Sequence, residues 1–282
     1  MSVLGHVPVG DSPHEVVVSE DGKTAFVANY GAQMAGHTLS VIDLEKRIEL
    51  RRVELLPLMR PHGIQVIGKR VYFSAESNRA FASYDPEADK IDFIMGTGQT
   101  ASHMIVGNAN ETRFYTANIA SNTITAFEFN SRPPAQNRIF QITVGNQPEA
   151  IDLSPDGKEV WIGLNVDKTI QIIDTDQKTV SATIDLGERP YRVRFSPDGK
   201  LVIATLTNRN EIAFIDAKSR KEIKRIKTES YPLGVIISKD SKLAYVTAVQ
   251  NDCVLKIDLT EFKIMQKAVA GAGPDGVALT GI

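Results

Sequence analysis

The chain has 282 residues, of which 42% are hydrophobic and 23% charged, and its 32 lysines and arginines nearly balance 34 aspartates and glutamates, for a formal charge of −2. This composition is typical of a globular protein. The near-neutral charge argues against nucleic acid as a partner, since nucleic-acid binding depends on excess positive charge. The single cysteine, Cys253, excludes a disulfide framework within the chain. We expect no membrane span, because no apolar run reaches roughly 18 residues, and residues 1–30 lack a signal-peptide pattern.

A recurring anchor organises the chain. After residues 3–10, which have the pattern of a fourth strand, a proline that mostly follows Gly-x-x begins a short apolar strand again and again. The intervals between successive anchors are 48, 40, 47, 42, 42 and 42 residues. A period of this length is typical of propeller blades and solenoid units. The anchors are Pro13, Pro61, Ala101 in the place of a proline, Pro148, Pro190, Pro232 and Pro274.

Each interval contains four short β-rich segments and no sustained helical period. In the interval that starts at Pro148 they cover residues 148–153, 159–162, 169–174 and 180–187. Four strands per repeat of about 42 residues predict a propeller blade, because solenoid repeats of that length are helical. Asp-Gly-Lys sequences such as Asp21-Gly22-Lys23 follow the first strand, and we interpret them as tight hairpin turns without a chemical role.

The sequence of these repeats resembles that of the YVTN family of β-propeller repeats. The resemblance is carried by residues 26–30 (Phe-Val-Ala-Asn-Tyr), 114–118 (Phe-Tyr-Thr-Ala-Asn), 154–158 (Ser-Pro-Asp-Gly-Lys) and 244–247 (Ala-Tyr-Val-Thr). It extends over essentially the whole chain and implies an all-β protein with one propeller domain over residues 1–282. It also implies an extracytoplasmic location. Lactonase and streptogramin-lyase propellers are more distant look-alikes, and they imply chemistry on a lactone or an ester.

The number of blades follows from counting strands. Seven first-strand anchors are present, but second and third strands exist for six intervals, and the last anchor, Pro274, is followed by one strand at most. Residues 3–10 would supply the missing fourth strand. We therefore expect seven blades, the last incomplete and closed by both termini, since closure removes exposed strand edges. Six blades, or a chain cut from a longer one, are the alternatives.

Rare polar residues gather on one predicted face. In an antiparallel blade the loops that enter the first strand and the loops that leave the second strand lie on the same face. The residues just after the anchors are mostly polar or ionisable, and convergent His, Glu and Arg side chains at the mouth of a channel form a candidate site. The candidate catalytic residues are His14, Glu15, His62, His103, Glu149 and Arg192; the candidate substrate-binding residues are Asn29, Tyr30, His37, Asn118, Tyr191 and Asp275.

Two interpretations of these residues stay open. In the first, they form a polar network between blades, in which Arg192 pairs with Glu149 or Glu15 and the histidines bind loop carbonyls. In the second, a histidine acts as base or ligand, the two glutamates are bases or ligands, and Arg192 binds a carboxylate or an oxyanion. His14, His62 and His103 are candidate ligands of one divalent metal ion, for which Zn, Cu, Fe, Ni and Mn all suit the donors.

We therefore predict a propeller that binds a small molecule at the channel mouth and acts as a hydrolase or lyase on a lactone or ester. The alternative is a non-catalytic, extracytoplasmic module that binds a protein or a glycan at the same face. Alanine variants of the histidines distinguish the two, because a network would lose stability and a site would lose binding or turnover.

Overall fold

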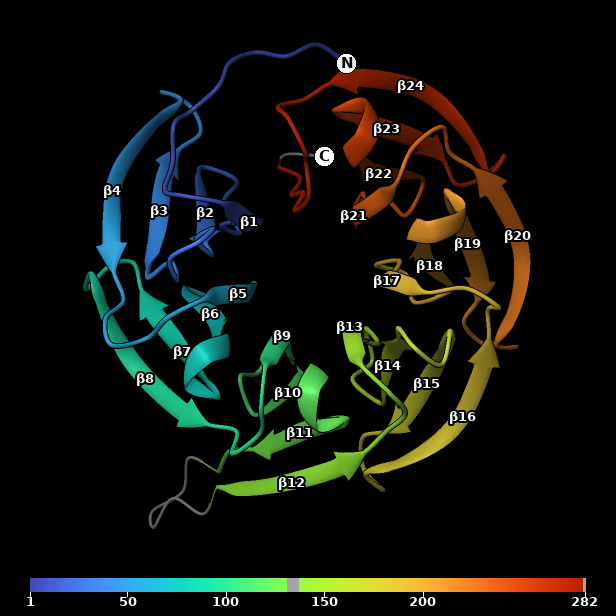
Figure 1. Ribbon diagram of the computed structural model, residues 1–282, viewed down its shortest axis with the longest axis horizontal. Helices are drawn as coiled ribbons and strands as arrows, with labels where there is room; N and C mark the ends of the chain where they lie inside the picture. The colour runs from blue at the N-terminus through green and yellow to red at the C-terminus, as the bar shows by residue number, and fades with distance from the viewer. Residues whose placement is uncertain (131–136, 281–282) are drawn as a thin grey trace. The chain divides into compact units, whose positions relative to one another are not determined.

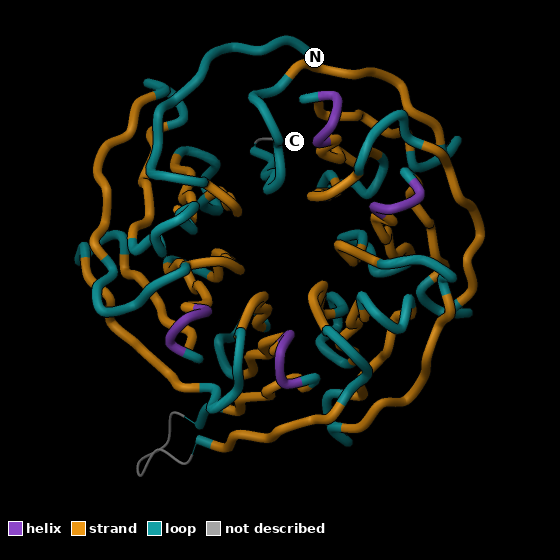
Figure 2. Tube along the Cα trace, in the orientation of Figure 1, coloured by secondary structure: helices purple, strands orange, loops and turns teal. Residues whose placement is uncertain are grey.

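The computed structural model describes residues 1–130 and 137–280 of the chain. These residues form β-strands, short turns and four single-turn 3₁₀ helices (Figure 2). The strands make six antiparallel sheets of four strands each, and within each sheet the strands follow one another in chain order. None of the helices in the described ranges is long and apolar enough to cross a membrane.

The chain divides into two compact units of three sheets each, and we call each sheet a blade. The amino-terminal unit covers residues Gly5–Pro148. Within it, the first strands β1, β5 and β9 lie next to one another (Figure 1). Its strands are β1 (Pro13–Val18), β2 (Thr24–Asn29), β3 (Thr38–Asp43), β4 (Ile48–Glu54), β5 (Pro61–Ile67), β6 (Arg70–Ala75), β7 (Ala80–Asp85), β8 (Lys90–Gly96), β9 (Ser102–Gly107), β10 (Arg113–Asn118), β11 (Thr123–Glu128) and β12 (Arg138–Thr143).

The carboxy-terminal unit consists of Met1–Leu4 and Glu149–Ile282. In this unit the first strand of the middle blade, β17, packs beside β14 and β21 of the neighbouring blades. Its strands are β13 (Pro148–Leu153), β14 (Glu159–Leu164), β15 (Thr169–Asp174), β16 (Thr179–Asp185), β17 (Pro190–Phe195), β18 (Leu201–Leu206), β19 (Glu211–Asp216), β20 (Lys221–Lys227), β21 (Pro232–Ile237), β22 (Leu243–Ala248), β23 (Cys253–Asp258) and β24 (Lys263–Val269). The prediction of a single domain over residues 1–282 stays a prediction.

Four of the apolar clusters lie between neighbouring blades. One cluster joins Phe26 and Leu39 of the first blade to Phe73 and Tyr84 of the second, all nearly fully buried. The second and third strands are mostly buried, as in β6 and β7. The fourth strands are more exposed and alternate between exposed and half-buried residues, as in β4 and β8, which is the pattern of a strand with one solvated face.

The predicted hairpin turns are confirmed. The Oδ1 atom of Asp21 accepts a hydrogen bond from the backbone N–H of Lys23 at 3.0 Å. The intervening Gly22 has φ 72°, a conformation that glycine adopts without steric cost. The same bond, from Lys158 N to Asp156 Oδ1 at 3.1 Å, closes the equivalent turn in the carboxy-terminal unit. These aspartates therefore serve turn formation.

The prediction of seven blades is wrong: the described residues contain six. The seventh anchor is still used, because Thr247 Oγ1 donates a hydrogen bond to the carbonyl oxygen of Asp275 at 2.8 Å. A Cβ on Gly234 would lie 2.2 Å from that same oxygen, so residues around 275 dock against β21 as a first strand would. They are not assigned to a strand in the described part of the chain, which runs to residue 280 here.

Residues 3–10 are not a strand either. Val7 and Val9 instead pack against the apolar cluster formed by Ala25, Val27 and Ile42 in the first blade. The alternation of apolar residues in this segment thus reflects packing on the surface of a blade. A paired strand shows the same alternation, so the sequence pattern did not distinguish the two.

Candidate functional site

Several first strands begin with an irregularity in their pairing. In β1 the pairing with β2 shifts between Pro13 and Glu15, so that His14 lies at the shift. The same shift falls on His103 in β9 and on Tyr191 in β17, and on the pair that begins with His62 in β5. Such bulges redirect a side chain and are frequent near functional sites.

This register corrects one alignment made from the sequence. Strand β9 begins at Ser102, not at Ala101. Ala101 has φ 55°, as do the residues just before the anchor prolines, Ser12 at 49° and Arg60 at 58°. Ser102 therefore takes the place of the proline, and His103 is the equivalent of His14 and His62. Three consecutive blades of the amino-terminal unit present a histidine at the same position.

The three histidines contact one another in a row. The His14 and His62 ring centroids lie 4.0 Å apart, and their Nε2 atoms lie 3.3 Å apart. The His62 and His103 centroids lie 3.6 Å apart with the rings inclined by 33°. His62 is in the middle and is only 1% exposed. We call these residues, with Tyr30 and Glu76, the histidine cluster.

Glu76 holds this cluster together, and the sequence analysis missed it. Its Oε2 lies 2.8 Å from His103 Nδ1, and its Oε1 accepts a hydrogen bond from the Tyr30 hydroxyl at 3.1 Å. Tyr30 also meets the His62 ring edge to face, with centroids 5.2 Å apart. Both Tyr30 and Glu76 are the first residue after a second strand, β2 or β6. The position directly after a second strand is the sequence feature by which Glu76 could have been identified, because Tyr30 was selected at the same position.

The electrostatics of the cluster favour an ionised Glu76. Burial alone raises the pKa of this carboxyl, but the hydrogen bond and charge of His103, the Tyr30 hydroxyl and the charge of Arg60 outweigh burial and lower the pKa below 4.5. An ionised carboxylate only accepts hydrogen bonds, so His103 donates through Nδ1–H. Burial and the nearby Glu76 carboxylate raise the pKa of Tyr30 to about 12, which keeps its hydroxyl protonated as a donor.

Arg60 closes one side of the cluster. Its guanidinium stacks on the Tyr30 ring, with Cζ 4.5 Å from the ring centroid, and donates to the Gly31 carbonyl at 2.8 Å. Glu15 lies on another side, with Oε1 3.7 Å from His14 Nδ1. His14, Glu15 and His62 each offer a ligand atom within 4.8 Å of the others, so they are the described residues whose spacing suits a metal ion.

Three other predicted residues of this unit have different partners. His37 Nδ1 lies 2.7 Å from Glu54 Oε1, so this histidine contacts the end of β4 instead of the cluster. Asn29 is buried and donates to Ser40 Oγ at 3.0 Å. Asn118 is buried as well and donates to Thr125 Oγ1 at 2.9 Å within its own blade. Both asparagines bind hydroxyl groups of the neighbouring strand, which is a structural role.

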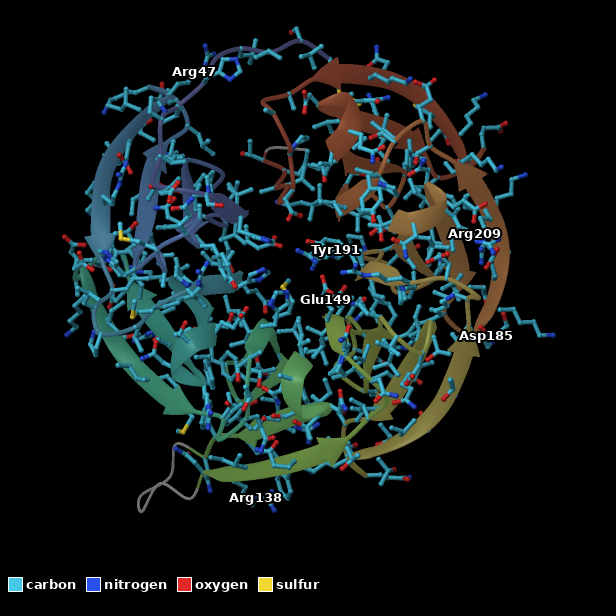
Figure 3. All side chains as sticks on the ribbon, in the orientation of Figure 1. Arg47, Arg138, Glu149, Asp185, Tyr191 and Arg209 are labelled. Atoms are coloured by element: carbon cyan, nitrogen blue, oxygen red, sulfur yellow. The ribbon has the colours of Figure 1, made fainter. Side chains whose placement is uncertain are left out.

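A second group of polar residues lies in the carboxy-terminal unit, where Figure 3 labels Glu149 and Tyr191. Glu149 is 7% exposed and accepts hydrogen bonds from Arg189 Nη2 at 2.9 Å and from Asn165 Nδ2. Asn165 is the first residue after β14, the place that Tyr30 and Glu76 occupy in their blades. The carboxylate is therefore held by a cation from the following blade.

Arg192 contacts Asp275, a partner that was not predicted from the sequence. Its Nη2 lies 3.8 Å from Asp275 Oδ1, and its guanidinium stacks on Tyr191 with Cζ 4.4 Å from the ring centroid. The Tyr191 hydroxyl donates to Asp275 Oδ2 at 3.2 Å. The contact between Tyr191 and Asp275 could not be predicted from the sequence, because the two residues are 84 positions apart and Asp275 lies in the docked segment after the sixth blade. Arg189, which the sequence analysis did not select, takes the place beside Glu149.

In chemical terms the histidine cluster combines several roles in a small volume. Glu76 and His103 form a carboxylate–imidazole pair, the arrangement that orients a histidine for proton transfer. The adjacent His62 and His14 offer further ring nitrogens, and Arg60 contributes a fixed positive charge. A carbonyl compound or a metal ion fits this set of donors better than an apolar ligand does.

Comparisons with known proteins agree with the fold. A family model described as a YNCE-like beta-propeller matches residues 131–281. Antigen Lp49 of Leptospira interrogans serogroup Icterohaemorrhagiae serovar copenhageni (strain Fiocruz L1-130) is 24% identical over 140 residues. That match covers 47% of this chain and 30% of the antigen, so the chain spans less than a third of this curated relative.

Solved structures extend the likeness over nearly the whole chain. A chain of Kuenenia stuttgartiensis hydrazine synthase matches with a TM-score of 0.82 and 16% identity, over 99% of this chain and 93% of that one. A functionally unknown protein from Desulfotomaculum acetoxidans DSM 771 matches with a TM-score of 0.78 and 14% identity, over 95% and 88%. A chain of a mitotic checkpoint complex matches with a TM-score of 0.79 and 15% identity, over 96% and 82%. At these identities the likeness concerns the propeller fold alone.

Proposed function

The chain belongs to the YNCE-like β-propeller family, and from that premise we propose that its histidine cluster binds a small carbonyl compound and hydrolyses a lactone or ester bond in it. A propeller fold supports many functions, so the proposal stands on the site and not on the family. The observation that carries it is the Glu76–His103 pair, with 2.8 Å between carboxylate oxygen and Nδ1.

His103 is the general base in this proposal. Glu76 accepts a hydrogen bond from His103 Nδ1–H, which leaves Nε2 as the ring nitrogen that takes a proton from water. The resulting hydroxide attacks the carbonyl carbon, and the bond to the ester oxygen breaks. The leaving alkoxide receives the proton from the His103 ring, so that one water and one ester give one acid and one alcohol. General acid–base catalysis of this kind contributes about 10²–10⁴-fold.

The remaining cluster residues bind and orient. Tyr30 and Glu76 fix each other by their 3.1 Å hydrogen bond, and the stacked His62 ring restricts rotation of His103.

The roles predicted for Glu149 as base or ligand and for Arg192 as an anion-binding group stay predictions. Each has a partner within its own unit, Arg189 or Asp275. Membership of the YVTN family and an extracytoplasmic location likewise stay predictions.

The test is hydrolysis of a panel of p-nitrophenyl esters and γ- and δ-lactones by wild type, His103→Ala, Glu76→Gln and His6→Ala. His6→Ala is the matched control, since His6 is exposed and is not one of the candidate site residues. We expect His103→Ala to lower kcat/KM by at least about 100-fold, Glu76→Gln to lower kcat more than it changes KM, and His6→Ala to match wild type. Turnover that is equal in wild type and His103→Ala would refute the proposal.

A non-catalytic module that binds a protein or a glycan is the second candidate. One of the similar structures is a chain of an assembly, the mitotic checkpoint complex. This candidate predicts no hydrolysis above the buffer rate for any member of the panel. It also predicts that cluster variants change the melting temperature without changing any turnover.

A further inference from the structure

We propose that His14, Glu15 and His62 bind a single transition-metal ion, with Zn²⁺ and Co²⁺ as the probes of choice. The inference deepens the proposed function, since it rests on the same cluster acting as the site, but it is argued from ligand geometry alone. This ligand set differs from the three histidines predicted from the sequence, because Glu15 takes the place of His103.

First, the two imidazole nitrogens, His14 Nε2 and His62 Nε2, are separated by a distance that suits two ligands of one zinc ion. Nε2 of His14 and Nε2 of His62 lie 3.3 Å apart, which is longer than the ordinary range of an N–H hydrogen bond to a neutral acceptor. Two nitrogens that each lie about 2.0–2.1 Å from one zinc ion at a tetrahedral angle are about 3.3–3.4 Å apart. The observed separation therefore suits one edge of a tetrahedral metal site without movement of either ring.

The second step is the carboxylate. Neighbouring residues in a regular strand point to opposite faces, but the register shift at His14 breaks this alternation and brings Glu15 beside it. Ligand atoms of all three residues lie within 4.8 Å of one another. Glu15 Oε1 also lies 3.7 Å from Nδ1, the ring nitrogen of His14 that does not face His62 Nε2. Coordination requires the Glu15 side chain to rotate toward the two Nε2 atoms.

The third step is the support around the ligands. His62 is 1% exposed and is packed between the His14 and His103 rings, so its orientation is fixed before a metal binds. The Glu15 side chain is 13% exposed, and its negative charge offsets part of the charge of a divalent ion. Among the described residues, the group whose ligand atoms all lie within 4.8 Å of one another consists of His14, Glu15 and His62 and does not include His103.

The donor set indicates the class of metal. Two imidazoles and one carboxylate favour Zn²⁺, Co²⁺, Ni²⁺ and Cu²⁺ over Ca²⁺ and Mg²⁺, which prefer oxygen donors. Three protein ligands leave a fourth position, which is the pattern of zinc sites that bind water. A metal there would sit next to the Glu76–His103 pair of the proposed hydrolytic site.

The experiment uses untagged, full-length protein that has been treated with EDTA and dialysed. Co²⁺ is added and its visible d–d absorption is followed, and Zn²⁺ binding is measured by calorimetry. We expect a stoichiometry near one and an intense band typical of tetrahedral Co²⁺. His14→Ala and Glu15→Gln should weaken Zn²⁺ binding by at least about tenfold, whereas the variant of the exposed His6, His6→Ala, should bind as wild type does.

His14→Ala is preferred to a His62 variant, since His14 is 23% exposed and its replacement disturbs packing less. Circular dichroism and the melting temperature without metal confirm that each variant folds. Absence of a Co²⁺ band in wild type, or equal Zn²⁺ affinity in wild type and both ligand variants, would overturn the inference. Metal binding without hydrolysis would contradict the proposed function alone, and hydrolysis by a wild-type protein that binds neither Co²⁺ nor Zn²⁺ would contradict the metal site alone.

Discussion

Replacing Gly63 by alanine tests the close approach of two blades at the histidine cluster. Gly63 follows His62 in β5, and a Cβ built on it would lie 2.6 Å from Met104 Cα and 2.7 Å from Ile105 N in β9. Real Cβ atoms do not approach backbone atoms so closely. The first strands of these two blades would therefore have to move apart by several tenths of an ångström or more.

The cost can be worked out from what that movement breaks. Overpacking of a dense interior costs about 1–3 kcal/mol. The buried hydroxyl of Ser74 also bridges the two blades, because it accepts a hydrogen bond from Gly63 N at 2.9 Å and donates one to the His103 carbonyl at 2.5 Å. Loss of one such bond removes about 0.5–1.5 kcal/mol more. We expect Gly63→Ala to lower the free energy of unfolding by about 2–4 kcal/mol.

Urea denaturation followed by circular dichroism measures this difference. Gly96→Ala in β8 is the matched control, because the nearest atom to its added Cβ is Arg79 O at 4.0 Å. The same substitution there should leave stability unchanged or raise it by about 0.4–1 kcal/mol through the unfolded chain. Equal unfolding free energies for the two variants would show that β5 and β9 do not approach each other as described.

Three further predictions concern charge and docking. Burial raises the pKa of Glu76, but its hydrogen bonds and nearby charges outweigh burial and hold the pKa below the unfolded value of 4.5. The ionised Glu76 therefore stabilises the folded protein fully above pH 4.5, and this stabilisation is lost as the pH falls through the folded pKa. In Glu76→Gln, the urea midpoint should fall less steeply with decreasing pH than in wild type. An equally steep fall in both proteins would contradict this prediction. Thr247→Val removes the hydroxyl that holds the Asp275 carbonyl, so hydrogen exchange of residues 274–280 should accelerate, whereas unchanged protection would argue against docking. Arg189→Met leaves the buried Glu149 carboxylate with one donor fewer and should cost about 1–3 kcal/mol in thermal or urea unfolding, with a neutral result disproving the importance of the pair.

The local elements could be predicted from the sequence because their causes lie within a few residues. The Asp21 side chain bonds to the backbone two residues away, and Gly22 supplies the left-handed turn conformation. Alternating apolar residues define each strand in the same local way. The repeat interval then implies four-stranded blades, and the place of the histidines at the start of first strands follows from counting along the repeat.

The register of the first strands could not be predicted in this way. Proline marks the strand start in most blades, but in β9 Ser102 stands in its place, so the equivalence of His103 with His14 and His62 became visible only from strand pairing. Whether a bulge is present depends on how two strands hydrogen bond, and this in turn decides that Glu15 lies beside His14.

Partner choice and blade number were decided by tertiary structure. His62 meets a histidine 48 positions away, and Tyr191 meets Asp275 at a separation of 84. Packing between blades sets both contacts, and it also allows the segment around Asp275 to dock without forming a strand. The sequence by itself therefore determined the turns, the strands, the blade unit and the candidate histidines. Tertiary structure alone decided which of their side chains meet, because contacts between blades depend on register and close packing over intervals that no local pattern encodes.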